Sequence, residues 1–532
     1  MRWPLILLAL SAPLAASFAP ADSSEPPRPP AHALCSGDTT APTHPAILPG
    51  YGSGGFPVRT DVPAAQAFFD NGMQLASAFA HRAAIAAFAE SARLDAACAM
   101  CAWGEAWSAG PTINYPIDPV EARRLARRAA DAARLAAGGP AREVALTTAL
   151  LLRYPANEKA NGNLAFAKAM DRVARNYPDD DAIQVLAADA WLIASEKEDY
   201  TLRSVALLEP VLARYPDYTP AIHFYIHATE LAGIAERAEP YADRLPALAP
   251  AASHLIHMPS HTYYHIGRYQ DAVDANMRAV AIGIANAKRL GLPQPDGVWD
   301  LPYHAHNVRY GVGAALISGD AKSALALSAP LVARAATAKG GDRSPYIQMV
   351  AGTAYFALGH FADPASVLAA PPPAKDLSYA AAYWHYARGE AQARRGDAAA
   401  VRAEAAAMLT PQGKLSWDDN SLPAARTIDI ARLVLQGRAA TLDGDYPAAL
   451  AAFRHAARLQ EGEEYSVLTD PPAFWYPVRR DIAATLLAMG KPREARTETE
   501  AVLEMMPRDP ETEKLRARIA MLQSSRIIVA RR

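Results

Sequence analysis

Histidines gather in one part of this 532-residue chain. Eight of its 14 histidines lie between residues 223 and 306, where composition alone would place about two. Neutral imidazole is the commonest side-chain ligand for transition metals, so the grouping indicates a metal site. The eight are His223, His227, His254, His257, His261, His265, His304 and His306.

Spacing along a helix decides which histidines can share an ion. Residues four apart rise about 6 Å, whereas residues eleven apart rise about 16 Å, beyond the reach of one ion. Neighbouring helices pack about 8–10 Å apart, and metal–nitrogen bonds of about 2.0–2.1 Å can close between two pairs at matching positions. The predicted primary ligands are therefore two i,i+4 pairs: His223, His227, His257 and His261. The other candidates form a second site or the outer shell that orients ligand rings: Glu230, His254, His265 and His306.

Helical periodicity places each set on one face. At about 100° per residue, His223, His227 and Glu230 share an arc of about 60°, and His254 to His265 share an arc of about 80°. Pro259 lies inside the second set. Because proline cannot continue a helix interior without a kink, it either bends this helix or begins a new one. The direction in which the side chains of His254 and His257 point depends on which of the two occurs.

The elements that carry these histidines belong to a repeat. Four segments share a Gly, an Ala five residues later and apolar residues at helical spacing: GIAERAEPYADRLPALAP, GRYQDAVDANMRAV, GDYPAALAAFRHAARL and GKPREARTETEAVL. On the same frame, Ser204, Ala238 and Ala272 follow one another at 34 residues. Ala84, Ala324 and Ala449 fit the small-residue position with less regular spacing. A fixed period of this length indicates helix-turn-helix repeats stacked into an all-α solenoid, interrupted by an inserted loop at about 285–303.

The repeat frame, together with DAACAMCAWGEAWSAGP, HFYIHATE, HMPSHTYYHIGRY and HAHN, resembles a group of secreted bacterial tetratricopeptide-repeat (TPR) proteins over residues 61–524. The resemblance implies a right-handed superhelical solenoid of TPR-like repeats whose concave groove is lined by five positions of each first helix. The candidate residues other than His304 fall on those positions, which implies a histidine-rich groove. On the C-terminal side, Tyr383, Tyr386 and Glu390 extend the groove, and Arg479 or Arg480 could hold an anionic group.

Two functions from different classes remain open. In the first, the groove binds a transition metal as a carrier or metalloenzyme, with Glu230 as candidate general base. All-imidazole ligation outside the cytoplasm suits copper or zinc, with iron as a third candidate. In the second, the groove holds a peptide or protein partner of the cell envelope without catalysis. The sequence contains no nucleophile elbow, P-loop or dinucleotide fingerprint.

Composition and the N-terminus bear on partners and location. The formal net charge is −2 and basic residues are scattered, which argues against nucleic acid or an anionic membrane surface as partner. Residues 1–21 read as a signal peptide, with an A-x-A-like cleavage point at Ala19-Pro20-Ala21; an uncleaved anchor is the alternative. No later stretch has the length and apolarity of a membrane span. We therefore expect a periplasmic or secreted protein with a Pro/Gly-rich tail at 22–60.

The three cysteines leave their pairing open. Cys98 and Cys101 could form a disulfide in an oxidising compartment, leaving Cys35 over, and a bridge from Cys35 to either is equally compatible. Haem attachment in its usual form is excluded, because Ala102 rather than histidine follows Cys101.

Overall fold

The computed structural model describes residues 45–156, 162–194, 198–301, 303–337, 345–408, 422–462, 465 and 471–530. The predicted signal peptide, Cys35 and the first part of the predicted tail lie outside these residues. The chain forms two compact units. Within the described ranges, unit 1 holds residues 45–262 and 278–301, and unit 2 holds 263–277 and 303–530.

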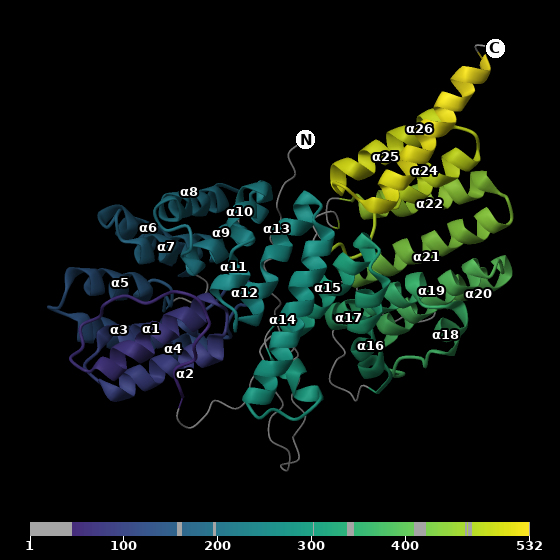
Figure 1. Ribbon diagram of the computed structural model, residues 1–532. Helices are drawn as coiled ribbons and strands as arrows, with labels where there is room; N and C mark the ends of the chain where they lie inside the picture. The colour runs from purple at the N-terminus through teal and green to yellow at the C-terminus, as the bar shows by residue number, and fades with distance from the viewer. Residues whose placement is uncertain are drawn as a thin grey trace. The chain divides into compact units, whose positions relative to one another are not determined.

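Every regular element of the described residues is helical, which confirms the predicted all-α repeat class (Figure 1). Unit 1 contains α1 (Pro63–Ser77), α2 (His81–Leu94), α3 (Ala99–Ser108), α4 (Pro119–Ala136), α5 (Ala141–Leu151), α6 (Gly162–Asn176), α7 (Asp181–Ile193), α8 (Glu198–Arg214), α9 (Thr219–Leu231), η1 (Ala235–Ala238), α10 (Glu239–Ala242), α11 (Leu245–Leu248), α12 (Ser253–His257) and η2 (Asp296–Asp300). Two helices pass from one unit into the other: α13 (Pro259–Ile266) and α14 (Tyr269–Arg289).

Unit 2 repeats the same construction, and in both units consecutive helices pack on one another. Its helices are α15 (His304–Ser318), α16 (Ala321–Thr337), α17 (Pro345–Phe361), α18 (Pro364–Ala369), α19 (Ser378–Arg394), α20 (Ala398–Ala407), α21 (Leu422–Leu442), α22 (Tyr446–Gln460), α24 (Arg479–Ala488), α25 (Pro492–Met505) and α26 (Pro510–Ala530). Among the described residues, no helix is long and apolar enough to cross a membrane.

The Gly and Ala of the sequence repeat have separate structural roles. Three glycines lie one or two residues after the end of a helix: Gly233, Gly319 and Gly444. Their φ angles are positive, at 68°, 82° and 75°. Glycine adopts this left-handed conformation without the strain that a Cβ adds, so it ends the first helix of a pair. The Ala five residues later is fully buried where the second helix meets the first; these residues are Ala238, Ala272, Ala324, Ala449 and Ala495.

Local signals set where several helices begin. Asp118, Asp180 and Asp445 accept hydrogen bonds from backbone N–H groups in the first turns of α4, α7 and α22. Such caps satisfy donors that have no partner inside the helix. A proline in the first turn of α4 and α22 costs no helical hydrogen bond, since those N–H groups are unpaired in any helix.

The described end of the predicted tail packs against unit 1. Tyr51 and Phe56 are buried, and the Ser53 backbone N–H donates to Thr219 Oγ1 at 2.7 Å. Thr219 begins α9, so this extended segment fixes the start of the helix that carries His223 and His227.

The structure answers two questions that the sequence left open. Helix α13 begins at Pro259, so the proline opens a helix, and the five-residue α12 ends before it at His257. Cys98 and Cys101 are joined by a disulfide at the start of α3. Helix α14 runs to Arg289, and the stretch predicted as an inserted loop at about 285–303 contains the short 3-10 helix η2.

Candidate metal centre

Helix α9 places two imidazoles in the interior of unit 1. It is buried around most of its circumference, from Thr219 to Thr229, as expected of a helix with neighbours on several sides. His223 has no exposed surface and His227 is 6% exposed. The i,i+4 spacing holds their ring centroids 5.0 Å apart, so the predicted pairing of these two is present.

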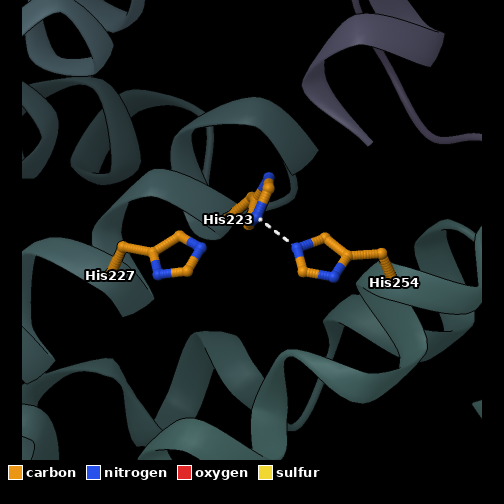
Figure 2. A group of neighbouring side chains, drawn as sticks. All are labelled: His223, His227 and His254. Atoms are coloured by element: carbon orange, nitrogen blue, oxygen red, sulfur yellow. Dashed lines mark hydrogen bonds between the residues drawn. The ribbon is translucent and has the colours of Figure 1, made fainter. Parts of the chain in front are cut away.

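The next side chain in reach comes from α12. His254 is 5% exposed, and its Nε2 lies 3.2 Å from His223 Nε2. One ligand atom from each of His223, His227 and His254 lies within 4.8 Å of the other two. Figure 2 shows the three rings directed toward a common space from the two helices. We call these three residues the histidine triad.

The distances in the triad suit one ion. Two nitrogens bound to the same metal at about 2.0–2.1 Å stand about 3.3 Å apart in tetrahedral geometry, close to the 3.2 Å between the Nε2 atoms of His223 and His254. His227 Nε2 is buried and makes no hydrogen bond with any described residue. A buried nitrogen left in this way is costly, and a metal ion is a partner that would satisfy it.

A backbone carbonyl fixes the tautomer of His223. Its Nδ1 lies 2.6 Å from the carbonyl oxygen of Ser77, at the end of α1. A carbonyl only accepts, so Nδ1 carries the proton and donates it, and the Nε2 lone pair is left for the centre of the triad. Ligating histidines are commonly held by such a partner on the other ring nitrogen.

Phe79 covers the triad with an aromatic ring. The ring stacks on His254 at 4.9 Å between centroids and on His227 at 6.0 Å, and meets His223 edge-on at 4.4 Å. Phe79 has a φ of 55°, a left-handed conformation that is unusual for a bulky residue and clusters at functional sites. The strained turn after α1 therefore places an apolar lid on the three imidazoles.

Burial keeps His223 and His227 neutral. It lowers the pKa of His227 to about 3 and holds that of His223 well below its ordinary value, and the neighbouring imidazoles act in the same direction. Neutral imidazole is the ligating species.

His257 and His261 form a second close pair beside the triad, with the His261 ring 5.4 Å from that of His227 and the His257 ring 5.6 Å from that of His254. Their Nε2 atoms are 3.1 Å apart. Glu230 Oε1 lies 2.9 Å from His261 Nδ1, and Glu230 Oε2 lies 3.9 Å from His227 Nδ1. The carboxylate therefore orients His261 and turns its Nε2 toward His257. Glu230 is thus placed between His261 and His227 as a positioning residue, and its role as a general base stays a prediction.

The predicted set of four is thus grouped differently in space. His254, expected in a second site or an outer shell, lies with His223 and His227, whereas His257 and His261 face each other. The remaining three of the eight clustered histidines belong to unit 2. His265 is near the end of α13, and His304 is buried at the start of α15. The His306 ring lies 4.4 Å from that of Tyr310.

Sequence reasoning missed Phe79, His81 and Asp189. Phe79 stacks on the His81 ring at 5.1 Å, and with His81 and Asp189 it lines a cavity of about 20 Å³, room for about one water. Burial lowers the pKa of His81 to about 4 and raises that of Asp189 to about 7. No spacing pattern identifies these residues, because they lie far from the histidine-rich segment in the chain.

Comparisons with known proteins add nothing to the fold described above. No protein-family model matches the chain, and no curated protein does so either. Similar solved structures include the APC/C hetero-tetramer Cut9–Hcn1, with 13% identity over 87% of this chain and 78% of that one and a TM-score of 0.31. Yeast Tom70 has 10% sequence identity, with 87% of this chain and 96% of Tom70 covered and a TM-score of 0.31. The human IFIT1 dimer with m7Gppp-AAAA has 11% sequence identity, with 80% of this chain and 89% of the IFIT1 chain covered and a TM-score of 0.33. Likeness at this level carries no argument about function.

Proposed function

We propose that this protein binds a transition metal ion through His223, His227 and His254. One observation carries the proposal: His227 Nε2 is buried without a hydrogen bond in the described structure, and it belongs to three buried imidazoles whose ligand atoms lie within 4.8 Å of one another. Peptide binding gives no reason to bury three adjacent imidazoles under a phenylalanine ring.

The donor set indicates the class of metal. Imidazole nitrogens suit zinc, copper and iron, whereas calcium and magnesium prefer oxygen ligands. Three histidines leave a fourth position of a tetrahedral ion for water or a substrate. The chain's own part is to hold the nitrogens neutral, fix the His223 tautomer through Ser77 and exclude bulk water with Phe79.

The decisive experiment separates His254 from the His257–His261 pair. Full-length protein is stripped with a chelator, reloaded with Zn²⁺ or Cu²⁺, freed of excess metal and analysed by mass spectrometry. We expect about one ion per chain in the wild type, because the three nitrogens of the triad can hold one ion. H254A should lose it, whereas H257A/H261A should retain it.

Two controls secure the interpretation. His385 belongs to unit 2, where its Nδ1 lies 2.7 Å from Glu404 Oε2, so H385A removes an imidazole without touching the triad and should keep the ion. Circular dichroism checks that each variant is folded. If H254A keeps the metal and H257A/H261A loses it, the four-histidine set predicted from the sequence is the right one. If wild-type protein takes up no metal, the peptide-binding scaffold replaces this proposal.

We also propose that the protein acts outside the cytoplasm, as the signal-like residues 1–21 indicate. The disulfide between Cys98 and Cys101 supports this location, because such bonds persist in oxidising compartments. N-terminal sequencing of the natively expressed protein should find a start near Asp22. An intact Met1 in a cytoplasmic fraction would overturn the location without affecting the metal site.

A further inference from the structure

Unit 2 contains a cavity of about 250 Å³ that the metal centre does not explain. Helices α17, α19, α21, α24 and α26 and the segment before α24 contribute its walls. The volume lies just below the range of about 300–1,000 Å³ typical of pockets for drug-sized ligands, so it suits a smaller molecule. Two features noted in the sequence meet here, namely Tyr386 with Glu390 and the arginine at 480. We call it the Arg480 pocket.

One wall of the pocket is a network of charged side chains around Arg438. Arg438 donates to Asp481, to the Tyr476 hydroxyl at 3.0 Å and to Glu390 at 3.3 Å. The Tyr476 hydroxyl also donates to Asp481. All three nitrogens of the Arg438 guanidinium thus donate to the wall, which holds this side chain in place as part of the pocket lining.

Arg480 retains donors. Among the described residues its guanidinium makes hydrogen bonds only through Nη1, at 3.4 Å to each oxygen of Asp509. That carboxylate already accepts from the backbone N–H and hydroxyl of Thr512. The Arg480 guanidinium lies over the Tyr476 ring at 4.3 Å, which orients the fork while Nε and Nη2 remain to donate. A fork of this geometry matches a carboxylate.

Arg479 is the contrasting neighbour. It donates through Nε and Nη2 to Glu461 and through Nη1 to Glu498. It is absent from the lining of the pocket. Of the two arginines that the sequence offered for an anionic group, the structure therefore leaves Arg480.

Acceptors and apolar rings complete the lining. Glu390 Oε1 accepts from Arg438 at 3.3 Å, and its second oxygen is available to a donor. The pKa of the buried Tyr386 hydroxyl is raised by burial and by Glu390, so it stays a neutral donor. Phe356 and Trp475 add aromatic surface, and the His360 ring lies 4.7 Å from that of Trp475.

The charges of the lining disfavour a ligand that is only an anion or only a cation. Two guanidiniums face three carboxylates, those of Glu390, Asp481 and Glu511. A simple anion would meet the carboxylates, and a simple cation would meet the guanidiniums. A zwitterion satisfies both, with its carboxylate on Arg480 and its ammonium toward Glu390.

We propose that the Arg480 pocket binds a free amino acid with an apolar or aromatic side chain. Arg480 holds the α-carboxylate, Glu390 accepts from the α-ammonium, and the side chain lies against Phe356 and Trp475. The site is independent of the metal centre, which lies in unit 1.

The test measures binding of L-phenylalanine to the full-length protein by isothermal titration calorimetry, next to probes that each lack one group. L-phenylalaninamide lacks the carboxylate, and N-acetyl-L-phenylalanine lacks the ammonium. We expect L-phenylalanine to bind at least tenfold more tightly than either probe. R480M should weaken L-phenylalanine at least tenfold and leave the amide unchanged, because the amide has no carboxylate for Arg480.

R479M is the matched control and should leave the affinity for L-phenylalanine unchanged. R480K keeps the charge without the fork and should recover part of the affinity that R480M loses, which a folding defect would not reproduce. Three results would each overturn the proposal: no heat of binding with L-phenylalanine at about 10 mM, a concentration that detects even millimolar affinity; equal binding of the N-acetyl probe; or unchanged affinity in R480M.

Discussion

The histidine triad of unit 1 and the Arg480 pocket of unit 2 are both polar sites in the interior of the fold, built on opposite principles. Unit 1 gathers groups that burial keeps neutral, with His223 and His227 shifted to low pKa. Unit 2 gathers full charges that neutralise one another, with Arg438 between Asp481 and Glu390. The two sites should therefore respond differently to the loss of one residue. Neutral imidazoles carry no charge that needs a partner, so the triad should tolerate the loss of one member, whereas removing Arg438 leaves two carboxylates without their shared cation.

The largest expected effect therefore lies in unit 2. R438M removes the cation that Asp481 and Glu390 share, whose side chains are 11% and 16% exposed. Removing one partner of a fully buried ion pair costs about 3–5 kcal/mol, and we expect a loss that approaches this range. Chemical unfolding at neutral pH should show this loss. R479M breaks ion pairs whose carboxylates are more exposed, 28% for Glu461 and 17% for Glu498. Because solvent screens exposed pairs, we expect a smaller loss, of about 1 kcal/mol. Equal losses in the two variants would show that the charges of unit 2 are not coupled as described.

The second prediction tests whether Asp189, which lines a small cavity with Phe79 and His81, is neutral in the fold. Burial raises the pKa of Asp189 from 3.8 to about 7. Between these values the native state holds a proton that the unfolded state has lost, so the contribution of this group to stability falls as pH rises from about 4 to 7. The shift corresponds to roughly 4 kcal/mol at about 1.36 kcal/mol per unit.

D189N removes this titration while keeping the side-chain shape. The variant should be more stable than the wild type above pH 7, and the advantage should shrink toward pH 4, as measured by urea unfolding at several pH values. If the difference in stability between D189N and the wild type does not change with pH across this range, the pKa of Asp189 is not raised in the fold.

The smallest expected effect is stabilisation by the ion itself. A ligand that binds only the native state adds about 2.7 kcal/mol at one hundred times its Kd. Scanning calorimetry should therefore show a lower Tm for wild-type protein after chelation. H254A should unfold at the same temperature with and without chelator. A chelator effect that survives in H254A would place the ion elsewhere.

Local features of the fold were accessible from the sequence. Gly319 and Ala324 mark the end of one helix and the tight contact of the next because each role depends on one residue's conformation or size. The pairing of His223 with His227 follows in the same way, since 3.6 residues per turn brings residues four apart onto one face. These inferences need no knowledge of distant segments.

The membership of the metal centre could not be obtained in this way. Whether His254 or the His257–His261 pair joins α9 depends on a break before Pro259, which the sequence allowed but did not require. Ser77 and Phe79 come from the end of α1, and Ser77 is 146 residues from the histidine that it orients. No periodicity links such positions.

By itself, then, the sequence determined the all-α repeats, the glycine ends of their helices and the concentration of imidazoles in one segment, because each of these rests on local conformation or composition. Only the tertiary structure decided that His254 completes the triad, that Phe79 covers it and that Arg480 rather than Arg479 faces a cavity. Neighbouring residues on a helix differ by about 100° in direction. What each of them meets is therefore set by the helices that pack around it.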